Sequence, residues 1–233
     1  MENLYKLGKY KETDRMCDLI CDHYPMLLVM SRFGIPLGFG DKSIREVCAE
    51  NGVDTDTFLA VVNLLREEGT KADTGNVSVE SLISYLRNSH DYFLEFRLPA
   101  IRRKLIEAID CRRSDVSFAV LRFFDEYAGE VRKHMQYEEE TVFPYVESLL
   151  TGRTDPAYNI GIFRKRHDQV EARLSELKNI LIKYYPAESS NELNGVLFDI
   201  FSCQRDLASH NYVEDHLFVP SIVRLERERG GRS

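Results

Sequence analysis

Four long stretches of the sequence carry apolar residues at alternating steps of three and four, the spacing of the buried stripe on an α-helix. They span residues 79–109, 115–150, 157–184 and 190–227. The first two stripes run through Val79, Ile83, Leu86, His90 and Phe93, and through Val120, Phe124, Tyr127, Val131, His134 and Glu138. The other two run through Ile160, Phe163, His167, Val170, Leu174, Leu177 and Leu181, and through Val196, Ile200, Cys203, Leu207, His210, Glu214 and Leu217. Each stripe is apolar except for one histidine, and on two of them a glutamate follows one turn later.

Short breaks separate these stretches, and they contain the Gly, Pro, Asp and Ser residues typical of helix ends and loops. Convincing runs with the period of two that strands show are absent. The sequence therefore predicts an all-α fold with an up-down-up-down four-helix bundle over residues 79–228. We expect a small helical N-terminal domain at 1–66, a polar linker at 67–78 and a short tail at 229–233.

The polar residues on the stripes are spaced like those of two similar helical hairpins joined in one chain. In both HMQYE (134–138) and HNYVE (210–214), a glutamate follows the histidine by four residues. A proline, Pro144 or Pro220, lies ten residues after each of these histidines. The histidines of the first two stripes are 44 residues apart, and those of the last two are 43 apart. In antiparallel hairpins of matching length, such residues converge at one level of the bundle.

Four imidazoles and two carboxylates on buried stripes indicate a metal site. A purely structural bundle is the alternative, since a single buried histidine is usually a hydrogen-bonded core residue. Buried carboxylates are costly without a compensating charge, and no Lys or Arg on the stripes supplies one. Two divalent or trivalent cations would do so, and this mixed nitrogen and oxygen set suits iron, manganese or zinc. The sequence predicts a binuclear centre that shares both carboxylates, with the ligands His90, His134, Glu138, His167, His210 and Glu214.

The composition argues against nucleic acid and anionic membranes as binding partners. The net charge is −7 and the isoelectric point is near 5.5, so there is no excess of Lys and Arg to bind nucleic acid or an anionic membrane. The sequence lacks a transmembrane-length apolar stretch and a signal-peptide core, which predicts a cytoplasmic protein.

The five cysteines are scattered and do not suggest a disulfide framework. Cys17, Cys21 and His23 offer metal-binding groups, but their spacing is not that of a zinc knuckle.

Three segments resemble the bacterial Repair of Iron Centres family, whose members pair a small N-terminal helical domain with a hemerythrin-like domain. They are SHDYFLEFRLPAI (89–101), HMQYEEETVFPY (134–145) and SHNYVEDHLFVP (209–220). The resemblance implies a non-haem di-iron centre bridged by two glutamates, with all six ligands at matching positions. It also implies a role in restoring iron–sulfur clusters damaged by nitric oxide or oxidants, with nitric oxide chemistry at the centre.

The sequence departs from the family pattern at two places. The family's N-terminal domain typically carries a Cys-Cys-Gly motif, whereas Leu37, Gly38 and Phe39 occupy that region here. Thiol chemistry assigned to that pair therefore does not transfer. One turn after the third histidine, close relatives have a small residue, and here Glu171 stands there, either as a solvated helix residue or as an extra carboxylate near the metals.

These observations predict a di-iron protein that binds or reacts with O2, nitric oxide or peroxide in the repair of iron–sulfur centres. The alternative is a sensor or carrier of O2 or nitric oxide that signals to a protein partner through its N-terminal domain. Iron–sulfur proteins are the expected partners of the repair function. Enzymatic turnover, donation of iron and oligomeric state are left open by the sequence.

Several residues near the ligands have predicted roles of their own. Glu130 and Asp206 lie one turn before ligand histidines and are candidates to orient them, with a solvated helix surface as the alternative. Tyr127 is either a core residue or near enough to reach the site. The residues predicted to face away from the metals are Glu139, Glu140 and His216.

Overall fold

The computed structural model describes residues 8–66, 75–109, 115–153, 158–165, 168–185 and 190–230. Apart from an isolated β-bridge between Arg15 and Ser43, the regular structure in these ranges is helical, which confirms the all-α fold class. Contacts divide the chain into two compact units, one of Met1–Ser89, Leu149–Thr154 and Tyr212–Ser233, the other of His90–Ser148 and Asp155–Asn211. Residues 67–74 of the predicted linker and 231–233 of the predicted tail lie outside the described residues, so the predicted domain boundaries stay predictions.

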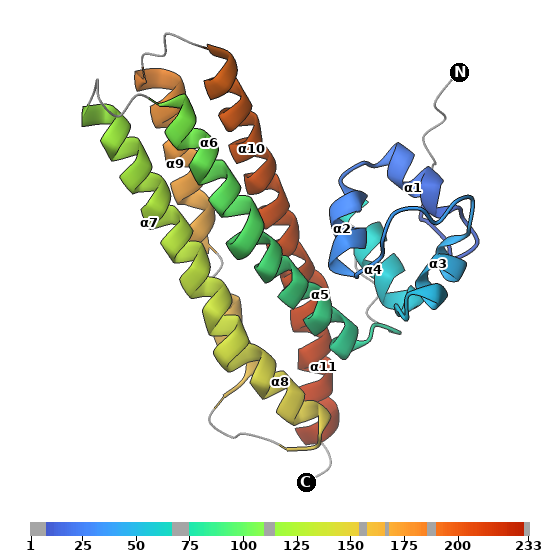
Figure 1. Cartoon of the computed structure of the whole chain (residues 1–233). Helices are drawn as coiled ribbons and strands as arrows, with labels where there is room; N and C mark the ends of the chain where they lie inside the picture. The colour runs from blue at the N-terminus through green and yellow to red at the C-terminus, as the bar shows by residue number, and fades with distance from the viewer. Residues whose placement is uncertain are drawn as a thin grey trace. The chain divides into compact units, whose positions relative to one another are not determined.

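Four short helices form in the N-terminal part of the chain (Figure 1). They are α1 (Met16–Asp22), α2 (Met26–Arg32), α3 (Ile44–Glu50) and α4 (Thr55–Arg66). Each contributes side chains to a shared apolar interior, among them the buried residues Leu19, Met30, Val47, Phe58 and Val62. The described part of residues 1–66 is therefore helical, while its prediction as a separate small domain stays a prediction.

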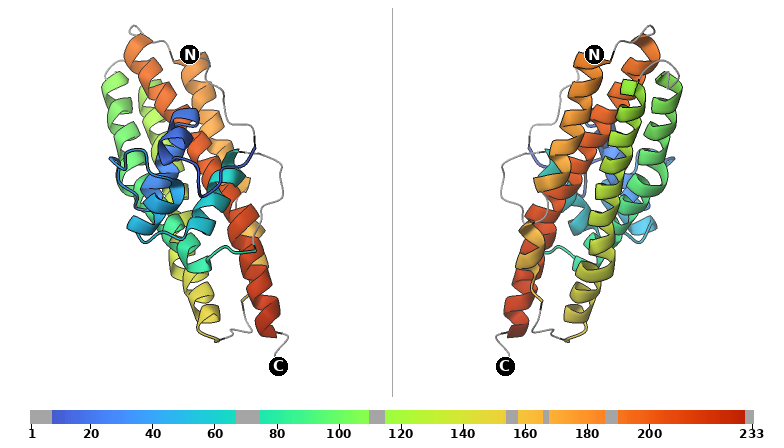
Figure 2. Two further views of the ribbon diagram at one scale, coloured as in Figure 1. Left: turned by 90° about the vertical axis from the view of Figure 1, so that its right-hand side faces the viewer. Right: turned by 90° about the vertical axis from the view of Figure 1, so that its left-hand side faces the viewer.

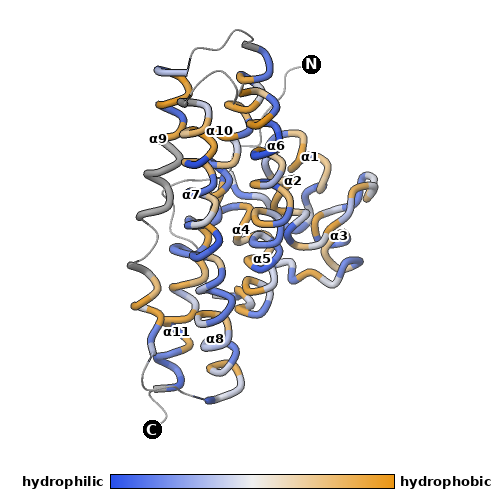
Figure 3. The backbone as a smooth tube through the Cα atoms, turned by 60° about the vertical axis from the view of Figure 1, so that its left-hand side comes forward, coloured by the Kyte–Doolittle hydropathy of each residue, from blue (hydrophilic) through white to orange (hydrophobic). Residues whose placement is uncertain are grey.

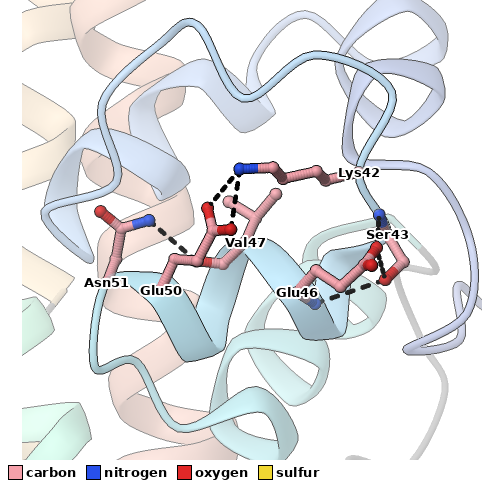
Figure 4. Close-up of polar contacts among 6 residues, drawn as sticks. All are labelled: Lys42, Ser43, Glu46, Val47, Glu50 and Asn51. Carbon is pink, nitrogen blue, oxygen red and sulfur yellow. Dashed lines mark hydrogen bonds and ion pairs between the residues drawn. The ribbon is translucent and has the colours of Figure 1, made fainter.

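A capping box fixes the start of α3. The Ser43 side chain accepts the backbone N–H of Glu46, and the Glu46 carboxylate accepts the backbone N–H of Ser43 at 2.8 Å (Figure 4). Two N–H groups that the first helical turn would leave unpaired are thereby satisfied. The ion pair between Lys42 and Glu50, at 2.7 Å, joins the residue before the cap to the end of the helix.

The remaining helices build the bundle, and their bounds follow the predicted stretches closely. The first stretch contains α5 (Val79–Asp91), the π-helical η1 (Tyr92–Arg97) and α6 (Leu98–Ala108), and the second contains α7 (Asp115–Tyr137), the π-helical η2 (Glu138–Val142) and α8 (Phe143–Leu150). The third contains the 3-10 helix η3 (Ile160–Lys165) and α9 (Asp168–Tyr184), and the fourth contains α10 (Ser190–Val213), the π-helical η4 (Glu214–Phe218) and α11 (Val219–Gly230).

Helices α6, α7, α9 and α10 run side by side (Figures 1 and 2). Apolar and polar residues alternate along them, as expected of helices that bury one face (Figure 3). Their interior is a continuous cluster of buried side chains that includes Phe93, Ile101, Leu105, Val120, Phe124, Tyr127, Val131, Leu177, Leu181, Val196, Ile200, Cys203 and Leu207. The stripe residues in this cluster are therefore core residues of the bundle, as the sequence predicts.

Each π-helical turn that the structure describes is followed directly by a proline at the second position of the next helix. η1, η2 and η4 come before Pro99, Pro144 and Pro220. Proline has no N–H to donate to the carbonyl four residues earlier, and its ring crowds that carbonyl. A wider turn relieves the crowding while the helix continues, and such turns occur frequently at functional sites.

Within the described ranges, none of the helices combines the length and the apolar character needed to cross a bilayer.

Candidate metal centre

Five of the six predicted ligands fall within the described residues, and they lie at the ends of α-helices, where the π-helical turns begin. His90 lies in the last turn of α5, two residues before η1. His134 lies in the last turn of α7, and Glu138 is the first residue of η2. The fourth stretch repeats this arrangement, with His210 in the last turn of α10 and Glu214 as the first residue of η4. The i, i+4 spacing puts each glutamate on the same helical face as its histidine.

Four of these residues converge. Ligand-capable atoms of His90, Glu138, His210 and Glu214 all lie within 4.8 Å of one another, and all four residues are buried. The rings of His90 and His210 meet edge to face, with 5.3 Å between their centroids. Within the part of the chain that the structure describes, no other group of three or more potential ligands comes together in this way.

The carboxylate of Glu138 joins a fifth predicted ligand to this group. Its Oε2 lies 2.8 Å from Nε2 of His90, and its Oε1 lies 2.8 Å from Nε2 of His134. The two oxygens of one carboxylate thus face histidines from two different helices. Of the six predicted ligands, five are therefore brought together, and the sixth, His167, lies outside the described residues.

The environment of Glu138 keeps this side chain ionised. Complete burial by itself raises the pKa of the carboxyl group, but hydrogen bonds from His134 and His90 outweigh that effect and hold the pKa well below its usual range. An ionised carboxylate only accepts hydrogen bonds, and it offers lone pairs to a cation.

Aromatic rings enclose the histidines. Phe143 stacks on His90 at 5.6 Å between ring centroids, and Phe163 stacks on His134 at 6.3 Å. Phe93 meets the ring of His210 edge-on at 6.0 Å. All three phenylalanines are buried. Rings of this kind restrict the rotation of the imidazoles and exclude water, so electrostatic interactions inside the site are stronger than they would be in solvent.

The donor set fits a transition-metal cation. Imidazole nitrogens and carboxylate oxygens together suit iron, manganese or zinc, and these groups are gathered in a buried, apolar surrounding. Two fully buried carboxylates, Glu138 and Glu214, lie close enough to repel each other strongly unless positive charge stands between them. A cation held by these residues supplies that charge.

Glu139 differs from its predicted role. The sequence placed it on the solvent side of the helix, but its Oε1 lies 2.8 Å from Nδ1 of His90 and its side chain is 36% exposed. The prediction was wrong because it assumed a regular α-helix at this point, where the chain forms the π-helical turn η2. The sequence feature that could have indicated this π-helical turn is Pro144, six residues after Glu138. Glu140 is exposed as predicted and accepts a hydrogen bond from Gln136 at 2.7 Å.

The structure gives the following surroundings for the other predicted neighbours of the ligands. Glu130 pairs with Lys133 at 3.0 Å, and Tyr127 is part of the apolar core. His216 is exposed, and its Nδ1 lies 3.0 Å from the carbonyl oxygen of Tyr212. Asp206 is largely buried, and its predicted role as an orienting residue stays a prediction. The side chain of Glu171 lies outside the described residues.

The N-terminal thiols do not form a second centre in the described residues. His23 Nε2 accepts a hydrogen bond from Nε of Arg66 at 2.8 Å, so this nitrogen already has a donor. Burial lowers the pKa of His23, with a further contribution from the nearby Arg66 charge. Cys17 lies 3.6 Å from the carboxylate of Asp18. Cys21 is exposed, and neither thiol belongs to a group of potential ligands found among the described residues.

Long helices packed around a buried cluster of histidines and glutamates define a helical-bundle protein with a cation site. The family model described as Hemerythrin HHE cation binding domain matches residues 81–222, which is more than half of the chain. The chain belongs to this family. All six predicted ligands fall inside the matched range. No curated protein matches the sequence.

Proposed function

We propose that the chain is a non-haem di-iron protein of the Repair of Iron Centres type, acting in the cytoplasm on iron–sulfur proteins damaged by nitric oxide or oxidants. The observation that supports it most directly is the Glu138 carboxylate, whose two oxygens face His90 and His134 beside the buried Glu214. The residues proposed to hold the two irons are His90, His134, Glu138, His167, His210 and Glu214. When bound, such an iron pair supplies ligand binding and electron transfer toward O2, nitric oxide or peroxide.

The chain's own residues would set the conditions for that chemistry. Glu138 and Glu214 provide the negative charge that retains two cations, and the imidazoles complete the set without adding charge. Phe93, Phe143 and Phe163 keep the histidines in place and keep bulk water away from them. A small uncharged molecule enters such an apolar surrounding at lower cost than an ion.

Metal analysis tests the proposal. The purified protein is expected to retain about two irons per chain, and its optical spectrum should differ between the oxidised and the reduced state. His134→Ala should lower the iron content markedly, whereas His216→Ala, at an exposed histidine that bonds the Tyr212 backbone, should leave it unchanged. A wild-type protein that carries no transition metal and is indifferent to chelators contradicts the metal assignment.

A second function has support from the N-terminal sequence, namely a sensor or carrier of O2 or nitric oxide. Leu37, Gly38 and Phe39 stand where the family's cysteine pair is usual, and Leu37 is 72% exposed. The thiol chemistry assigned to that pair is therefore missing from this position, while binding at the bundle would be unaffected.

Single-turnover experiments with nitric oxide separate the two functions. The repair-type proposal predicts that the reduced protein consumes nitric oxide irreversibly. Reversible binding, with full recovery of the starting spectrum when the gas is removed, would favour the sensor or carrier. The metal-depleted protein serves as the control in both measurements.

A further inference from the structure

We propose that Glu139 is a positioning residue, which fixes the orientation and the tautomer of His90 at the metal centre. The inference rests on the proposed metal site and extends it, because it assigns a role to a side chain that is not among the six ligands. Glu139 comes directly after the ligand Glu138 in the chain, and both lie in η2.

The two successive carboxylates contact opposite nitrogens of one imidazole. Nε2 of His90 lies 2.8 Å from Oε2 of Glu138, and Nδ1 lies 2.8 Å from Oε1 of Glu139. The histidine side chain is only 3% exposed, while that of Glu139 is 36% exposed. Glu139 therefore stands between the buried ring and the surface of the bundle.

The chemistry of imidazole and carboxylate determines which group donates the hydrogen in the contact between His90 and Glu139. A neutral imidazole carries one hydrogen, on either Nδ1 or Nε2, and an ionised carboxylate can only accept it. Without a cation, Nε2 faces the Glu138 carboxylate as a hydrogen-bond donor. When a cation takes the place of the Nε2 hydrogen, a carboxylate on Nδ1 favours the tautomer with the hydrogen on Nδ1, so that the lone pair of Nε2 is available to the cation. Carboxylates placed in this way behind metal-bound histidines fix the ring and raise its basicity.

The backbone explains why two neighbouring residues reach the same ring. In an α-helix, consecutive side chains diverge by about 100° around the axis, which would carry Glu139 away from a ring that Glu138 contacts. The π-helical turn η2 starts at Glu138 and has more residues per turn, so the angle between neighbours is smaller. The next helix, α8, begins with Phe143, whose ring stacks on His90 with 13° between the planes. One continuous segment, 138–143, thus holds the His90 ring on both edges and on one face.

The neighbouring Glu140 shows that this contact is specific to Glu139. Glu140 is exposed, and it accepts a hydrogen bond from Gln136 on its own helix at 2.7 Å. Its removal takes away the same charge from the same turn without touching His90. Glu140→Ala is therefore a matched control for Glu139→Ala.

Competition for Fe(II) between the whole protein and a chromogenic chelator, under anaerobic conditions, tests the inference. Glu139→Ala is expected to weaken Fe(II) binding by about 10- to 100-fold, the usual effect of losing a carboxylate behind a metal-bound histidine. Glu139→Gln should fall between this variant and the wild type, because its amide oxygen still accepts the hydrogen bond but carries no charge. Glu140→Ala should bind as the wild type does.

Proton exchange in the Zn(II)-loaded protein gives a second readout, and backbone amide exchange in the same sample shows whether a general loss of stability contributes to it. The Nδ1–H of His90, detected by NMR with ¹⁵N-labelled histidine, should exchange slowly with water in the wild type and in Glu140→Ala, and rapidly in Glu139→Ala. Wild-type affinity together with a protected Nδ1–H in Glu139→Ala would overturn the positioning role alone. A wild type that binds no Fe(II) would instead contradict the proposed di-iron centre, so the two failures are distinguishable.

Discussion

Glu138→Ala is expected to abolish retention of the metal centre, with a loss of affinity well beyond the 100-fold that marks the upper end for orienting residues. The reason is the place of this carboxylate between two helices. One oxygen lies 2.8 Å from His90 Nε2 and the other lies 2.8 Å from His134 Nε2. Its removal takes away a ligand group, half of the buried negative charge supplied by the two glutamates, and the group that both histidines face.

Iron content after anaerobic reconstitution, measured against Glu140→Ala, checks this expectation. Glu140 is an exposed member of the same acidic run, so its variant reports on the loss of one surface charge from η2. Far-ultraviolet circular dichroism should be the same for both variants, because neither removes a helix cap or a packed apolar side chain. Iron retained by Glu138→Ala at the wild-type level would show that Glu138 is not a ligand.

Most of the fold could be predicted because helix period is a local property. Steps of three and four residues fix which side chains share a face, and they place His134 with Glu138 and His210 with Glu214 whatever the helices pack against. The breaks between the stretches could be predicted from the same kind of local signal, since glycine and proline act on their own turn. For these reasons the observed helix bounds differ little from the predicted ones.

The contact between Glu139 and His90 could not be predicted from the helix period. A regular helix puts it about 100° from Glu138 and into solvent. The π-helical turn that brings it to His90 depends on hydrogen bonding between residues five apart and on the crowding caused by Pro144. The proline was visible in the sequence, but its effect could be a kink, a break or a wider turn. Only the packing of His90, from another helix, makes the wider turn useful.

Metal removal is expected to produce the second large effect, on stability rather than on binding. A ligand that binds only the folded protein stabilises it by about 4 kcal/mol when present at 1,000 times its dissociation constant. Chelation removes this contribution. It also leaves the buried carboxylates of Glu138 and Glu214 close together, with their ligand atoms within 4.8 Å and the neutralising cations gone. The midpoint of thermal unfolding should therefore fall by many degrees in the metal-free wild type.

Glu214→Leu should raise the stability of the metal-free protein, whereas removal of the metal lowers the stability of the wild type. In the metal-free protein, an apolar side chain of similar size at this fully buried position removes the repulsion and the desolvation of a carboxylate, and the variant should be more stable than the metal-free wild type by about 1–2 kcal/mol. It should gain nothing from added Fe(II), because a ligand is lost. Glu228→Leu, at an exposed position of α11, is the control and should respond to metal as the wild type does. If metal-free Glu214→Leu were less stable than the metal-free wild type, the carboxylate would be serving the fold itself, and the view that this bundle gives up stability for cation binding would be wrong.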